Sequence, residues 1–110
     1  MIARVANESH ANDVLILDLQ NLTVITDYFV IASAETTVQV RAIVQAIAEA
    51  LAEEDMIYTR REGWDEASWV LLDYGGVIVH VFLDEQREYY DLERLWGDAP
   101  RLSAAEAQSR

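Results

Sequence analysis

The sequence predicts an α/β (α+β) domain with a mixed β-sheet flanked by helices. Short apolar segments with the character of strands are interleaved with segments of helical period, and a Gly-Gly turn joins two further strands. A sheet of this kind needs helical cover to bury its faces. With 110 residues the chain forms one domain that buries roughly 65% of its unfolded surface in a single core.

The N-terminal third predicts a weak helix and two buried strands. Residues 1–10 form the helix, with their few apolar side chains on one side. Residues 14–17 are a short apolar run between two aspartates, which suits a buried strand. A polar turn follows at residues 20–23, and residues 28–32 are expected to form the second buried strand.

The longest helix is expected to begin just after Thr36. Thr36 and Gln39 have the spacing of a capping box, in which each residue satisfies a backbone N–H near the other. The acidic residues 53–55 end this helix where its dipole prefers cations, so we expect that end to be solvated. One face of the helix is apolar at positions i, i+3, i+4, i+7 and i+11, namely Val40, Ile43, Val44, Ile47 and Leu51.

The remaining elements are a third strand at residues 57–61, a polar loop at residues 62–67, a hairpin, and a final helix. The final helix starts at Asp84 or Glu85, where acids suit the first turn. Tyr89, Leu92 and Trp96 are expected on one side of it, and Gly97 and Pro100 end it. We therefore predict a single domain over residues 1–100 and a disordered tail over residues 101–110.

The hairpin from Trp69 to Phe82 has two different faces. Gly75-Gly76 forms a two-residue turn, so Tyr74 faces Val77 and Trp69 faces Phe82. Side chains alternate along each strand. One face is therefore aliphatic with one tyrosine and is expected to pack under a helix; it carries Val70, Leu72, Tyr74, Val77, Val79 and Val81.

The other face of the hairpin mixes large apolar groups with an acid and an imidazole: Trp69, Leu71, Asp73, Ile78, His80 and Phe82. A core face rarely needs Asp73 and His80, and a solvent face rarely needs so many large apolar groups. This composition fits a surface that meets a partner. A second helix could instead cover this face, which would make Trp69 and Phe82 ordinary core residues. The pattern leaves both interpretations open.

The charge is strongly acidic. There are 20 acids against 8 arginines and no lysine, so the net charge is −12. Phosphate backbones should repel such a chain, so we expect little direct nucleic-acid binding and favour a basic protein as partner. Acidity that serves only solubility is the simpler alternative. The absence of cysteine excludes disulfides and thiolate sites. The absence of a long apolar run makes a cytoplasmic location the default expectation.

Residues suited to catalysis are scarce, so the sequence predicts no enzyme, catalytic residue, metal site or cofactor. His10 and His80 are the two histidines and are far apart in the chain. The glycines lack the spacing of a phosphate-binding loop. Asp91 and Glu93 are expected on a helix, where i and i+2 side chains point apart. We interpret His80 as a residue that contacts a partner rather than as a base.

Three segments in order resemble the ribosomal silencing factor family, also called Iojap-like. Residues 26–32 read TDYFVIA, residues 69–82 contain an LDYG-x-VIVHVF run, and residues 87–96 read R-x-x-Y-x-L-E-x-L-W. The resemblance covers roughly residues 13–100. The chain departs from the family pattern with Ser33-Ala34 where Thr-Gly is common, Val38 where an arginine is common, Gly76 where an aspartate is common, and a shorter N-terminal helix.

The resemblance implies a nucleotidyltransferase-like fold without the catalytic motif of the transferases. It also implies binding to the fourteenth large-subunit ribosomal protein, which blocks joining of the small subunit and represses translation. The partner-binding face then extends to Tyr90 and Glu93 of the closing helix. The free protein is expected to form a homodimer that hides part of this face. An active nucleotidyltransferase and a homodimeric scaffold without a ribosomal role are the alternatives.

Overall fold

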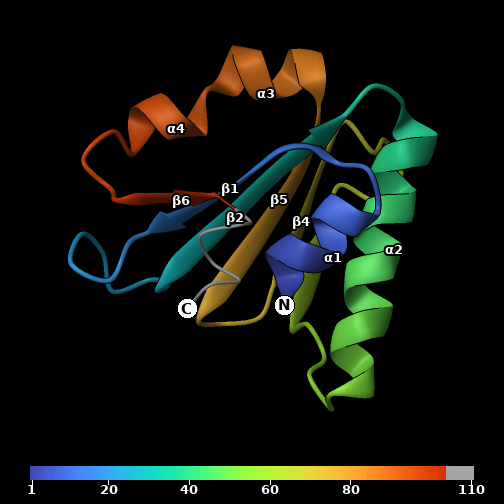
Figure 1. Ribbon diagram of the computed structural model, residues 1–110, viewed down its shortest axis with the longest axis horizontal. Coiled ribbons are helices and arrows are strands. Elements are labelled where there is room, and N and C mark those ends of the chain that lie inside the picture. Colours follow the sequence, from blue (N-terminus) through green and yellow to red (C-terminus); the bar gives the residue numbers. More distant parts are fainter. Residues whose placement is uncertain (104–110) are drawn as a thin grey trace.

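The computed structural model describes residues 1–103 and contains a six-stranded mixed sheet with helices on both faces (Figure 1). The strand order is β3-β4-β5-β2-β1-β6, in which β2 and β5 are parallel and the other neighbours antiparallel. The predicted α+β class is confirmed. The elements are α1 (Ile2–Glu8), β1 (Asn12–Asp18), β2 (Tyr28–Ala34), α2 (Thr37–Glu53), β3 (Arg60–Glu62), β4 (Trp69–Asp73), β5 (Val77–Leu83), α3 (Asp84–Tyr90), α4 (Leu92–Leu95) and β6 (Arg101–Ser103).

The β4–β5 hairpin has the predicted register. Trp69 pairs with Phe82 and Asp73 with Ile78. The backbone N–H of Tyr74 donates to the carbonyl of Val77 at 2.9 Å, which closes the turn. Gly75 adopts a φ of 85°, a conformation that costs glycine little because it has no Cβ.

Helices α1 and α2 cover one face of the sheet, and α3 and α4 lie on the other (Figure 1). Thr36 caps α2 with both bonds of the predicted capping box. The aliphatic hairpin face packs under α2 as predicted. The valine, leucine and isoleucine residues of this core with at most 1% exposure are Val40, Ile43, Val44, Ile47, Val70, Leu72, Val79 and Val81. None of the helices within residues 1–103 has both the length and the apolar character needed to cross a membrane.

The last predicted helix is in fact two short helices, α3 and α4, which meet at Asp91. Asp91 has a φ of 47°, in the left-handed region, and its N–H donates to the carbonyl of Arg87 at 2.9 Å. The predicted common side of Tyr89, Leu92 and Trp96 is therefore wrong. Leu92 and Trp96 pack against the sheet, whereas Tyr89 is 79% exposed.

Two boundaries also differ from the prediction. The third strand begins at Arg60 rather than Ile57, and the N–H of Thr59 donates to Asp73 at the point where pairing with β4 starts. The domain continues beyond residue 100, because Arg101–Ser103 pairs with β1 as β6. The predicted tail is therefore wrong for residues 101–103, and the rest of it, residues 104–110, lies outside the described residues.

Candidate partner-binding surface

The mixed face of the hairpin is half core and half surface. On β5, Ile78, His80 and Phe82 are buried, with exposed fractions of 7%, 4% and 0%. On β4, Trp69 and Leu71 are partly exposed. Burial under α3, α4 and the neighbouring side chains keeps the β5 residues from the free surface, so Trp69, Leu71 and Asp73 are the members of this face that the free protein exposes. Contact of all six residues with a partner stays a prediction.

Trp69 is held on three sides by other rings. Its ring stacks on Phe82 with centroids 4.9 Å apart, and the ring of Tyr90 lies 4.7 Å away. Its indole N–H donates to Nδ1 of His80 at 3.0 Å. Aromatic pairs at these separations add to stability beyond the area they bury. Trp69 is thus fixed in one orientation while part of it stays accessible.

His80 acts as a neutral hydrogen-bond acceptor. Burial lowers the pKa of His80 from 6.5 to about 4, so its imidazole is uncharged at neutral pH. Because Nδ1 accepts from Trp69, the proton lies on Nε2, which is buried and has no hydrogen-bond partner among residues 1–103. The ring of Phe29 meets the imidazole edge-on at 4.5 Å. His80 therefore orients Trp69 from inside the protein and does not itself reach the surface.

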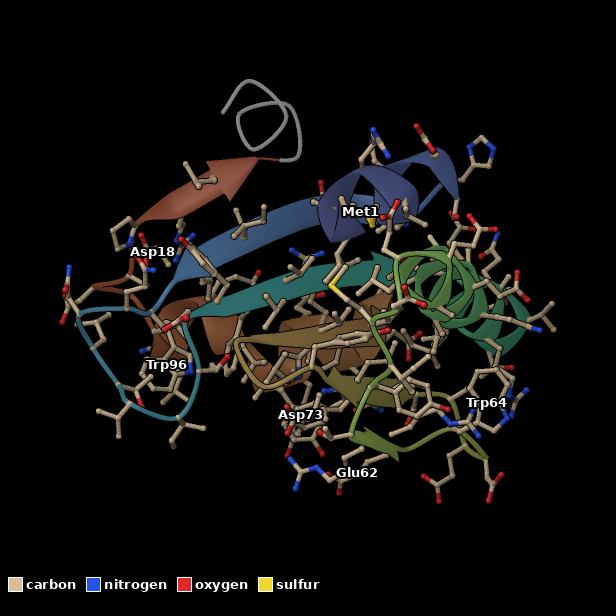
Figure 2. The ribbon with its side chains drawn as sticks, turned by 90° about the horizontal axis from the view of Figure 1, so that it is seen from below. Met1, Asp18, Glu62, Trp64, Asp73 and Trp96 are labelled. Carbon is tan, nitrogen blue, oxygen red and sulfur yellow. The ribbon has the colours of Figure 1, made fainter. Side chains whose placement is uncertain are left out.

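Asp73 supports the hairpin turn. Its Oδ1 accepts from the N–H of Gly75 at 2.8 Å, and its Oδ2 lies 3.5 Å from the guanidinium of Arg60. Arg60 also pairs with Glu62 at 2.9 Å, so the three charged side chains gather where β3 and β4 meet (Figure 2). Asp73 is 22% exposed and its carboxylate already has partners. It is a turn residue at the border of the surface rather than a free rim acid.

Exposed aromatic residues extend the surface from β4 onto α3. Tyr90 is 47% exposed and Tyr89 is 79% exposed, and their rings meet at 5.1 Å. Leu71 lies two residues beyond Trp69 on the same side of β4. We call Trp69, Leu71, Tyr89 and Tyr90 the aromatic surface. Sequence reasoning missed Tyr89, because a continuous helix would turn it toward the sheet.

Glu93, predicted as a rim acid, is paired with Arg87. Its Oε2 lies 3.4 Å from Nε of Arg87, whose side chain is only 10% exposed. Nη1 of Arg87 also donates to the carbonyl of Asn12 and to Oγ of Ser33, both at 3.2 Å. In the sequence, Arg87 stands out only as part of the segment that resembles the family. A guanidinium that is nearly buried among several acceptors indicates a structural or functional role for the arginine. The spacing of residues in the sequence does not show such burial.

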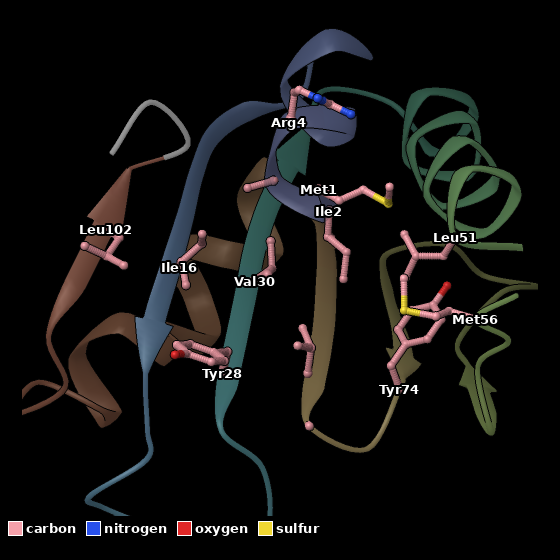
Figure 3. Close-up of a pocket in the computed structure, with 13 residues that line it drawn as sticks. Met1, Ile2, Arg4, Ile16, Tyr28, Val30, Leu51, Met56, Tyr74 and Leu102 are labelled. Carbon is pink, nitrogen blue, oxygen red and sulfur yellow. The ribbon is translucent and has the colours of Figure 1, made fainter. Parts of the chain in front are cut away.

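Two cavities of the described residues lie outside the aromatic surface. A polar cavity of about 480 Å³ lies beside Arg87 and is lined mainly by carboxylates. An apolar cavity of about 470 Å³ lies on the other face of the sheet, between α1, the end of α2 and β6 (Figure 3). Within residues 1–103, no group of three or more His, Asp or Glu is placed to hold a metal ion.

Comparisons with known proteins place the chain in a family. The family model described as "Ribosomal silencing factor during starvation" matches residues 1–110. The ribosomal silencing factor of Bacillus subtilis is 43% identical over 98 residues, which are 89% of this chain and 83% of that protein. The mouse protein named "Mitochondrial assembly of ribosomal large subunit protein 1" is 31% identical over 99 residues. The match covers 87% of this chain and 43% of the mouse protein.

A solved structure from Chromobacterium violaceum has the same fold. It superposes with a TM-score of 0.85 at 32% identity and covers 88% of this chain and 81% of that one. The sequence resemblance is therefore confirmed over the whole domain. The chain belongs to the ribosomal silencing factor family, whose members are ribosome-associated regulators of translation.

Proposed function

We propose that this protein binds the large ribosomal subunit through its fourteenth ribosomal protein and blocks association with the small subunit, which represses translation in the cytoplasm. Membership of the family supports a ribosomal role. The name of the mouse relative refers to the large subunit, which favours that subunit over the small one.

The observation that carries this proposal is the partly exposed Trp69 beside Tyr90. Tryptophan and tyrosine are enriched among the residues that dominate binding energy, and they act best when the free protein already holds them in place. The stack on Phe82 and the bond to His80 provide that order for Trp69. Tyr89, whose ring meets that of Tyr90, and Leu71, on the same side of β4 as Trp69, add further apolar area.

The charge of the protein supports a basic partner. The net charge of −12 would speed encounter with a basic ribosomal protein, and carboxylates line the polar cavity next to α3. The acidity also disfavours direct contact with ribosomal RNA. Protein–protein contact is therefore the expected mode of binding.

Cosedimentation tests the proposal. The protein is mixed with purified large subunits, with small subunits, and with each after addition of the isolated fourteenth ribosomal protein. We expect it to pellet with large subunits alone and to be released by an excess of that ribosomal protein. Equal recovery with both subunits, or no release by the competitor, would contradict the proposed partner.

A homodimer in the absence of ribosomes is a second proposal from the same surface. An exposed patch that contains Trp69, Tyr89 and Tyr90 is a liability in free solution, and two copies can cover it symmetrically. Sedimentation at rising concentration should show a monomer–dimer equilibrium that Trp69→Ala shifts toward monomer. A strict monomer at high concentration would contradict it.

A further inference from the structure

Helix α3 carries much of the aromatic surface but has few means of holding itself in place. It has seven residues, none of them buried, and no side chain in the described part of the chain caps its N-terminus. A helix this short is unstable by itself in water, so tertiary contacts must fix it. The position of Tyr90 therefore depends on whatever ties α3 to the sheet.

Arg87 makes most of the side-chain hydrogen bonds that hold α3 against the rest of the protein. Its guanidinium donates to the Asn12 carbonyl on β1 and to the Ser33 hydroxyl on β2, and it pairs with Glu93 on α4. One side chain thus joins two strands and the helix beyond the break at Asp91. Three acceptors around one nearly buried guanidinium match its planar fork of donors, which a lysine cannot reproduce.

Arg87 and Tyr90 are three residues apart on α3, so they lie on neighbouring positions of one side of the helix. When Arg87 is fixed to the sheet, the ring of Tyr90 comes to rest 4.7 Å from Trp69. Two further side-chain hydrogen bonds hold the ends of the α3–α4 segment. Asn12 donates to Asp84 at 3.2 Å, and Arg101 donates to the carbonyl of Glu93 at 2.8 Å.

We propose that Arg87 is the positioning residue of the aromatic surface: it fixes α3 on the sheet so that Tyr90 packs on Trp69. It is not itself a contact residue, because its side chain is 10% exposed and occupied by the protein's own acceptors. Its effect on binding large subunits rests on the proposed function. Its effect on the contact between Tyr90 and Trp69 does not.

The first test needs no ribosome. In NMR spectra, cross-relaxation between the Tyr90 ring and the Trp69 indole should be clear in the parent protein. It should be lost in Arg87→Met, and Arg87→Lys should restore it only in part. Arg94→Met is the matched control, because Arg94 is an exposed arginine of α4 and its loss changes the net charge equally. A preserved contact in Arg87→Met would overturn the proposal.

The second test is a double-mutant cycle on binding to large subunits. Arg87→Met should weaken binding about tenfold in the parent, which is the effect of one lost charge-assisted bond, and should have no further effect in a Tyr90→Ala background. A merely structural role would weaken binding in both backgrounds. An equal loss in both would therefore overturn the proposal.

A milder variant covers the case in which Arg87→Met does not fold. Ser33→Ala removes one acceptor of Arg87 and leaves the guanidinium in place. It should weaken the Tyr90–Trp69 cross-relaxation in the same direction, by less, and an unchanged contact would count against the proposal. If the parent itself fails to bind large subunits, the proposed function is wrong, and the NMR test still decides the role of Arg87.

Discussion

The indole N–H of Trp69 donates a 3.0 Å hydrogen bond to Nδ1 of His80, which lies diagonally across the β4–β5 hairpin. The bond joins a residue at the surface to one that is 4% exposed. Because a charged imidazole could not accept at Nδ1, the bond also requires His80 to remain neutral. The orientation of the main surface tryptophan is thus set by a histidine of the core.

Trp69→Ala should weaken binding to large subunits by about 2 kcal/mol or more, the threshold that defines a hot spot. Trp69→Phe should lie between Trp69→Ala and the parent, because it keeps a ring on Phe82 but removes the N–H that His80 accepts. Titration of labelled protein with large subunits measures both. Trp64→Phe is the matched control, because Trp64 lies near α2 (Figure 2) and packs against the core on the α2 face of the sheet, whereas Trp69 packs against the core on the opposite face.

These variants separate a surface role from a core role. Trp69→Phe leaves Nδ1 of His80 without a donor, so the free energy of unfolding should fall by about 1–2 kcal/mol. If Trp69→Ala instead unfolds the domain while Trp69→Phe binds like the parent, Trp69 is a core residue and the aromatic surface is wrongly assigned.

His80 should make stability depend on pH between about 6.5 and 4. The unfolded chain binds a proton there with the ordinary pKa of 6.5, whereas the folded protein binds it only near pH 4. The contribution of neutral His80 to the free energy of unfolding is therefore fully present above pH 6.5. It is lost as the pH falls, and the loss reaches about 2 kcal/mol at pH 5. His80→Gln removes this ionisation, so urea denaturation should show a flatter pH dependence than the parent. Parallel curves for the two proteins would contradict the buried neutral histidine.

Exposed acids of α3 should govern the rate of association. Glu88 lies on α3 next to Tyr89 and lines the polar cavity, whereas the carboxylate of Glu93 already has Arg87 as partner. Glu88→Gln should therefore slow association and flatten its dependence on salt, with little effect on dissociation. Glu93→Gln should instead weaken the pairing of α4 with Arg87 of α3, and so should mainly raise the dissociation rate.

Stopped-flow binding to the isolated fourteenth ribosomal protein across a salt series measures both rates. Glu54→Gln, at the exposed end of α2 away from α3, removes the same charge and should leave association unchanged. If Glu88→Gln and Glu54→Gln slow association equally, net charge rather than local charge controls encounter.

The break between α3 and α4 predicts the response of Asp91 to substitution. Asp91 has a φ of 47°, which aspartate tolerates and glycine adopts freely. Asp91→Gly should keep the stability of the parent, whereas Asp91→Val should lose about 1–2 kcal/mol because its branched Cβ crowds the backbone there. Urea denaturation measures both. Equal stability of Asp91→Val and Asp91→Gly would mean that the joint can adopt another conformation.

Alternation and turn chemistry were enough to predict the register of the hairpin, because Gly75-Gly76 fixes which residues face each other. The capping box at Thr36 likewise fixed the start of α2. The break at Asp91 could not be predicted, because the residues around it keep a helical pattern and one left-handed residue leaves no periodic sign. The pairing of β6 with β1 joins segments far apart in the chain, which local patterns do not reveal.

For the site, the composition of the hairpin face indicated the right region but not the depth of each residue. Ile78, His80 and Phe82 are covered by groups from α3, α4 and β2, none of which alternation on β5 can show. The role of Arg87 depends on acceptors from Asn12 and Ser33, which only the fold brings together.

If the aromatic surface blocks joining of the ribosomal subunits, as proposed, light scattering should detect the block. Large subunits are first mixed with the parent protein, with Trp69→Ala or with the control Trp64→Phe, and small subunits are then added. The parent and Trp64→Phe should suppress the rise in scattering that marks subunit joining, and Trp69→Ala should restore it. Normal joining in the presence of saturating parent protein would contradict the proposed block of subunit joining. Suppression by Trp69→Ala equal to that by the parent at limiting concentration would contradict the role of the aromatic surface.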